Sequence, residues 1–190
     1  MASLVTPVGI LSFPVLFSPR PRAANQEPVY ACSILFDQDA QRSPQYQALR
    51  AAVLEEIDNK NGIGKSKDKQ FMQGVRSPFR PCNEKPYKGY DIPGGIFISP
   101  WTKTKPGIVD AVRNEVMLAE DVWAGQLVRA SVNPFWYHNS GNRGVSFGLN
   151  NLQICRTDGE RLDGRRAAKE EFGDYADALG GLDDDEDNPF

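Results

Sequence analysis

Apolar and polar positions change their spacing along the chain, and each spacing predicts a different element. Residues 7–18, PVGILSFPVLFS, are rich in apolar and β-compatible side chains, and their prolines favour an edge strand. PRPRAANQEP then reads as a loop. The short run Val29 to Phe36, VYACSILF, is apolar and β-favouring, so it predicts a strand in the core.

The period then becomes helical. Ser43 before Pro44 is a typical N-cap with proline at the first helical position. Arg50, Glu55 and Glu56 fall elsewhere on the helical wheel, and NKNGIG predicts an end near residue 59. The apolar positions that repeat at helical spacing are Tyr46, Leu49, Ala52, Val53 and Ile57.

The second half predicts strands among long loops. Residues 60–105 read as irregular apart from a strand at Ile96 to Trp101. Two strand-like stretches between residues 126 and 156 flank HNSGNRG, a turn signal, and together predict a long hairpin. Residues 161–179 favour a weak helix or linker, and residues 180–190 a disordered acidic tail, which leaves residues 1–160 as one domain.

These elements predict a mainly β fold with one major helix. About five strands suit a small five-stranded antiparallel barrel, whereas a sandwich requires about seven strands at regular spacing.

Composition excludes several classes of protein. The chain of 190 residues has no apolar run of about 18 residues, and its first twenty residues lack the basic start of a signal peptide, so we expect a cytoplasmic protein. Cys32, Cys82 and Cys155 form no close pair with each other or with His138, which argues against disulfides and against zinc. We therefore expect no metal and no cofactor.

Charge divides the chain into two parts. The sequence carries a net charge of -3, but nine acids and no bases lie after Lys169. Residues 1–169 therefore hold 22 bases against 16 acids, a net charge of about +6. A basic body joined to an acidic tail indicates a polyanionic partner for the body.

The positive excess lies in residues 60–105, which hold ten bases and three acids interleaved with aromatic residues. Bases neutralise phosphates and aromatic faces stack on unpaired bases, so the mixture is typical of single-strand binding. The alternative is that strand aromatics are core and that the lysines are a solvated loop. The candidate phosphate contacts are Lys65, Lys67, Lys69, Arg76, Arg80, Lys85, Lys88, Lys103, Lys105 and Arg143. The candidate stacking residues are Tyr87, Tyr90, Trp101 and Trp136.

Catalysis has little support in the sequence. His138 is the only histidine, and it lies at a predicted turn. GIGKSK lacks the spacing of a phosphate-binding loop and does not follow a strand. We therefore expect a binding protein and not an enzyme.

The ending DDDEDNPF resembles the acidic C-terminus of bacterial single-stranded DNA-binding proteins, which ends in Ile-Pro-Phe, with Asn188 at the isoleucine position. The stretches RSPQYQALRAAVLEEI, GIFISPWTK and NRGVSFGLNNLQICR resemble a phage family of such proteins that was once a domain of unknown function. The resemblance implies an oligonucleotide-binding (OB) fold. The chain differs from the bacterial proteins in its insert at residues 60–105 and in the missing glycine- and glutamine-rich linker. The resemblance therefore does not imply the bacterial tetramer, and a homodimer is the alternative assembly.

The leading hypothesis is a sequence-tolerant single-stranded DNA-binding protein acting in phage DNA replication, recombination or repair in the host cytoplasm. The alternatives are an RNA-binding or nucleic-acid chaperone protein, and a phage structural protein with a DNA-mimic tail. The tail is expected to compete for the DNA groove and to recruit replication or recombination proteins. Its residues are Asp183, Asp184, Asp185, Glu186, Asp187, Pro189 and Phe190.

Overall fold

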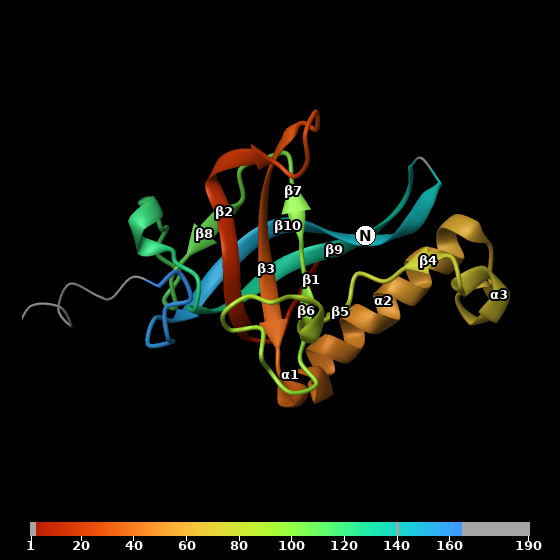
Figure 1. Cartoon of the computed structure of the whole chain (residues 1–190), viewed down its shortest axis with the longest axis horizontal. Coiled ribbons are helices and arrows are strands. Elements are labelled where there is room, and N and C mark those ends of the chain that lie inside the picture. Colours follow the sequence, from red (N-terminus) through yellow and green to blue (C-terminus); the bar gives the residue numbers. More distant parts are fainter. Residues whose placement is uncertain (1–2, 140, 165–190) are drawn as a thin grey trace, which may run out of the picture.

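The computed structural model describes residues 3–139 and 141–164, and Figure 1 shows a twisted β-barrel with the three α-helices on one side. Residues 161–164 contain no helix; the rest of the expected helix at 161–179 and the acidic tail lie outside the described residues.

Five strands close the barrel. β2 pairs with β3, β3 with β7, β9 with β10, and β9 returns to β2, all antiparallel, whereas β7 pairs with β10 in parallel. This ring confirms the expected mainly β, OB-like fold. The strands are β2 (Gly9–Pro21), β3 (Pro28–Phe36), β7 (Trp101–Thr102), β9 (Leu127–Asn139) and β10 (Asn142–Arg156).

Short strands extend the sheet beyond the ring. β1 (Leu4–Val5) pairs with β9, β6 (Ile96–Ile98) pairs with β3, and β5 (Arg80–Pro81) pairs with β6. β4 (Val75–Arg76) and β8 (Gly107–Val109) both run parallel to β10. The expected strand at 96–101 is therefore split into β6 and β7, which pair with different parts of β3.

The core lies inside the ring because alternate residues of each strand point inward. Leu11, Ile34, Val128 and Phe147 are at most 1% exposed and belong to one continuous cluster. The predicted hairpin is confirmed: β9 and β10 pair from Asn139 and Asn142 at the turn down to Leu127 and Arg156.

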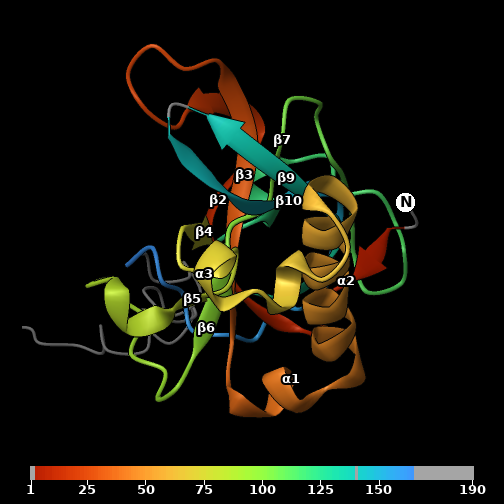
Figure 2. The same cartoon turned by 90° about the vertical axis from the view of Figure 1, so that its right-hand side faces the viewer.

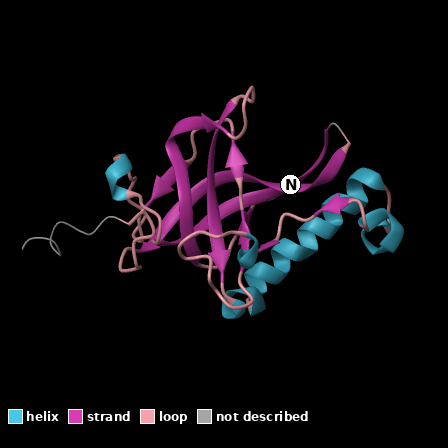
Figure 3. Ribbon diagram, viewed as in Figure 1, coloured by secondary structure: helices cyan, strands magenta, loops and turns pink. Residues whose placement is uncertain are grey.

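The α-helices lie below and beside the barrel, and one 3-10 turn, η3 (Ala119–Asp121), lies on the opposite side (Figure 3). The α-helices are α1 (Gln38–Arg42), α2 (Pro44–Asn61) and α3 (Lys69–Met72), and the other 3-10 turns are η1 (Lys65–Lys67) and η2 (Cys82–Glu84).

The major helix, α2, begins as predicted. The Ser43 hydroxyl accepts a hydrogen bond from the Tyr46 amide at 3.2 Å, which caps the helix before Pro44. The helix ends at Asn61, two residues later than expected, because Gly62 adopts φ 108°, a conformation that suits glycine. Four of the five predicted apolar positions are buried, and Ala52 is half-buried.

Glu56, predicted to lie on the polar face of α2, is buried. Its side chain is 2% exposed, and one carboxylate oxygen accepts the Trp136 backbone amide of β9 at 3.0 Å. The second oxygen has no hydrogen-bond partner among the described residues. A residue expected in solvent is thus buried because β9 offers it a backbone donor.

We expect Leu49→Ala to lower the free energy of unfolding by about 2–5 kcal/mol, because this fully buried side chain would leave a cavity between α2 and the barrel. Leu54→Ala, at a position of the same helix that is 45% exposed, is the matched control and should change it by less than about 0.5 kcal/mol. Urea unfolding measures both. Equal losses in the two variants would contradict the assigned buried face.

Candidate nucleic-acid interface

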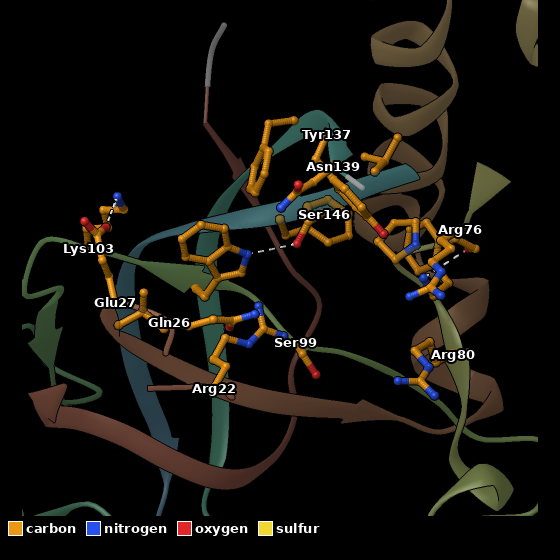
Figure 4. Close-up of a pocket in the computed structure, with 18 of the residues that line it drawn as sticks. Arg22, Gln26, Glu27, Arg76, Arg80, Ser99, Lys103, Tyr137, Asn139 and Ser146 are labelled. Atoms are coloured by element: carbon orange, nitrogen blue, oxygen red, sulfur yellow. Dashed lines mark hydrogen bonds and ion pairs between the residues drawn. The ribbon is translucent and has the colours of Figure 1, made fainter. Parts of the chain in front are cut away.

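A groove of about 1030 Å³ opens on the outside of the barrel. One wall comes from the β2–β3 connection, another from the β9–β10 hairpin, and a third from the segment at residues 76–80, with β7 between them. Figure 4 shows the basic side chains of Arg22, Arg76, Arg80 and Lys103 around this groove, and Trp101 also lines it.

Aromatic side chains line the groove. Trp101 is half-buried, and its indole N–H donates to the Ser146 hydroxyl at 3.2 Å, which fixes the plane of the ring. The Phe135 ring meets it edge to face, with centroids 5.5 Å apart. Tyr137 lies two residues further along β9 and therefore on the same face. A fixed, half-exposed indole is a surface on which a planar base can stack.

Four cations surround these rings. The Arg80 guanidinium pairs with Glu84 at 2.6 Å, and the Lys103 ammonium pairs with Glu27. For Arg22 and Arg76, no carboxylate among the described residues lies within ion-pair distance. The groove is therefore positive overall and holds two arginines available to an anion.

Arg22 lies over Trp101, with its guanidinium carbon 5.8 Å from the ring centroid. Desolvation lowers its pKa from the ordinary arginine value, and the nearby Tyr137 opposes this shift. The guanidinium remains charged near neutral pH, since arginine side chains do not deprotonate in proteins. A partly desolvated cation beside an aromatic face is suited to a phosphate that follows a stacked base.

The predicted phosphate contacts do not all lie in the groove. Arg76, Arg80 and Lys103 line it. Lys85 lines a second hollow, and Lys88 pairs with Glu160 at 2.9 Å. The others lie around the insert or at the barrel edge: Lys65, Lys67, Lys69, Lys105 and Arg143.

Two of the four candidate stacking residues need correction. Tyr90 is 3% exposed and packs in a small core cluster, so its face is not open to a base. Trp136 points to the opposite side of β9 from Phe135 and stacks on Phe71 with centroids 6.2 Å apart. Trp101 lines the groove, and Tyr87 is 47% exposed outside it.

Sequence reasoning missed Arg22, Phe135 and Tyr137. The alternation of side chains along the strand PFWY separates Phe135 and Tyr137 from Trp136, but it does not show which set faces the groove. Arg22 belongs to a segment predicted only as a loop. The β2–β3 and β3–β7 pairings together bring it to Trp101.

The insert is anchored to the hairpin through Phe71. The Arg143 guanidinium lies 4.5 Å from the Phe71 ring centroid and donates to the Phe71 carbonyl at 2.9 Å. Lys65 lies over the same ring at 5.4 Å. β4 then pairs in parallel with β10 at Gly144, where a Cβ would come within 2.5 Å of the Arg76 carbonyl oxygen. This docking places Arg76 at the groove.

Metal and membrane features are absent from the part of the chain that the structure describes. There, no three His, Cys, Asp or Glu side chains form a group that could hold a metal ion. Likewise, no described helix is long and apolar enough to cross a membrane. Burial raises the pKa of the Cys32 thiol to about 12, which keeps it protonated.

A family model matches most of the chain. The family described as "Enterobacter phage Enc34, ssDNA-binding protein" matches residues 3–185. A search of curated sequences found no match.

Solved structures share the fold. The single-stranded DNA-binding protein of bacteriophage Enc34 in complex with ssDNA is 20% identical, with a TM-score of 0.63 over 83% of this chain and 88% of that one. Its C-terminal truncation is 18% identical, with a TM-score of 0.67 over 83% and 86%. The gp2.5 protein of bacteriophage T7 is 11% identical, with a TM-score of 0.56 over 87% and 97%.

We expect Arg143→Ala to lower the free energy of unfolding by about 1–3 kcal/mol, because it removes a charged hydrogen bond and a cation–π contact. Lys67→Ala, an exposed base of the same insert, is the matched control and should leave it unchanged within about 0.5 kcal/mol. Urea denaturation compares the two. Wild-type stability of Arg143→Ala would show that this arginine is not the anchor of the insert.

Proposed function

The chain belongs to the single-stranded DNA-binding family of Enterobacter phage Enc34, and from this premise we propose that it binds single-stranded DNA without base preference. We propose further that it acts without catalysis in phage DNA replication, recombination or repair, in the cytoplasm of the infected cell. The similarity of the chain to the Enc34 and T7 proteins, which are both single-stranded DNA-binding proteins, supports this proposal.

The observation that carries the proposal is the combination, in one groove, of half-buried aromatic rings with arginines that have no carboxylate partner among the described residues. Trp101, Arg22 and Arg76 line one groove, and the Arg22 guanidinium carbon lies 5.8 Å from the Trp101 ring centroid. Duplex DNA hides its base faces, so it can use the charge but not the rings; a single strand uses both.

Sequence tolerance follows from the same chemistry. Every base has a π-face, so stacking on Trp101 and contact with Phe135 or Tyr137 select for an unpaired base and not for a particular one. The phosphate contacts position the strand and carry no sequence information. The proposed binding energy therefore comes from terms shared by all single strands.

Titration with oligo-dT, followed by quenching of tryptophan fluorescence, tests the proposal. Arg76→Ala should weaken binding by about two- to fivefold, the value of an exposed ion pair of about 0.5–1 kcal/mol. The slope of log affinity against log salt should fall by about 0.7, because one phosphate contact is lost.

Arg50→Ala, an exposed base on α2 outside the groove, is the control and should keep the wild-type affinity and slope apart from a weak long-range effect. Binding of oligo-dT that does not depend on salt would refute the proposed groove. Tighter binding of a matched RNA oligonucleotide would favour the RNA-binding alternative, since an RNA binder uses the 2′-hydroxyl.

We also propose a role for the acidic segment at residues 183–190, which lies outside the described residues. Five consecutive carboxylates can imitate a run of phosphates, so they are suited to occupy the positive groove when DNA is scarce. The Pro189–Phe190 pair offers an apolar element that a replication or recombination protein can bind.

A chain shortened after Gly181 should bind oligo-dT several-fold more tightly at low salt, with the difference shrinking as salt screens the competing carboxylates. Replacing all five acidic residues by Asn and Gln while keeping Pro189 and Phe190 is the matched control for partner binding. That variant should bind DNA like the shortened chain but keep its protein partners. If both variants had the DNA affinity of the wild type, the acidic segment would not compete for the groove and would serve only solubility.

A further inference from the structure

A second aromatic surface lies beside the groove and shares no lining residue with it. It covers a hollow of about 620 Å³ that Lys85, Tyr87 and Tyr90 help to line. The Phe13 ring meets the Tyr87 ring edge to face, with centroids 4.9 Å apart. Phe13 is 51% exposed and Tyr87 is 47% exposed, so both present apolar faces to solvent. We call Phe13, Tyr87 and Lys85 the Tyr87 platform.

The backbone at Phe13 is strained. Its φ is +46°, and it lies where the register of β2 against β3 shifts between Ser12 and Val15. A positive φ is rare for a bulky side chain and costs about 1–3 kcal/mol. The ring contacts Tyr87 and Tyr90 but remains 51% exposed, so packing buries only about half of the side chain at this strained position. Strain that exposes a ring is typical of a binding site.

The platform stands on a rigid base. Tyr87 packs edge to face on buried Tyr90 at 5.8 Å, and Tyr90 packs in the same way on buried Phe97 at 5.4 Å. Beneath them lies Cys82, which is fully buried and whose pKa burial raises to about 11. Because Tyr90 and Phe97 are fixed in the core, Tyr87 is held in one position.

The same rings connect the platform to the groove. The Arg80 guanidinium lines the groove and lies 5.5 Å from the centroid of Phe97. Residues 80–85 form the boundary: Arg80 and Glu84 face the groove, whereas Pro81, Asn83 and Lys85 face the second hollow. In Figure 2 this segment, the β2–β3 turn and the hairpin tip project to the same side of the barrel.

We propose that a single strand leaving the groove past Arg80 continues across this boundary and stacks a further base on the Tyr87 platform. The Lys85 ammonium, 6.0 Å from the Tyr87 ring centroid, takes the adjoining phosphate. This inference rests on the proposed function of the groove, and it adds a second binding subsite to it.

Single-stranded DNA suits this surface better than an apolar partner. Asp91 lines the same hollow, but neither it nor any other described carboxylate lies within ion-pair distance of Lys85, so the platform combines open rings with an available cation. The competing occupant is an acidic peptide, since Lys88 contacts Glu160 and the Arg161 carbonyl near the end of the described chain. The experiment separates the two.

The test measures affinity against length for oligo-dT of about 4 to about 16 nucleotides. The affinity of the wild-type protein for oligo-dT should show a second increase with length, at the length that lets the strand extend from the groove past Arg80. Phe13→Gly and Tyr87→Ala should leave the shortest oligonucleotides unaffected and lose about fivefold or more for the longest, the value of one stacked base. Glycine accepts φ of +46° without strain, so Phe13→Gly should remain folded at the wild-type melting temperature.

Val112→Ala, which removes another exposed apolar side chain (72% exposed), is the matched control and should behave as wild type at every length. Equal loss at all lengths, or no loss in folded Phe13→Gly and Tyr87→Ala, would overturn the second subsite while leaving the groove in place. Retained DNA binding with lost binding of a peptide of residues 181–190 would assign the platform to a peptide instead. Failure of wild-type protein to bind any oligo-dT would refute the groove itself.

Discussion

The pairing of β10 with four other strands is the constraint on which the rest of the structure depends. β9 covers one edge of β10 along its length, and the short strands β4, β7 and β8 divide the other edge among them. The β7 pairing closes the barrel, and the β4 pairing brings the insert to the groove. A close approach at Gly144 and the Arg143 contact with Phe71 make the latter pairing possible.

Closure of the barrel also determines which basic side chains lie near the aromatic side chains of the groove. Arg22, Arg76 and Trp101 are far apart in sequence, yet each lies at a strand end or strand connection that the ring brings together. Acidic partners already neutralise Arg80 and Lys103 within the chain, whereas Arg22 and Arg76 have none among the described residues. The groove therefore carries positive charge that a polyanion can use, without excluding the rings from solvent.

In the β9–β10 hairpin, alternate side chains of β9 have different roles. Phe135 and Tyr137 face the groove, while Trp136 between them packs on Phe71 and receives support from Glu56 through its backbone amide. One strand therefore lines the groove with one face and holds the insert with the other. Residues that look alike in sequence differ in role because their side chains point in opposite directions.

The sequence by itself determined the local elements and the class of ligand. Ser43 and Pro44 specify the start of α2, HNSGNRG specifies the hairpin, and the basic and aromatic composition of residues 60–105 indicates a nucleic-acid partner. Only the tertiary structure decided which residues form the groove. Tyr90 and Trp136 are aromatic and lie near basic residues in the sequence, but Tyr90 packs in a core cluster and Trp136 packs on Phe71. Strand pairing, in contrast, brings Arg22 from a loop to the Trp101 ring. Such contacts join distant segments, so no local pattern encodes them.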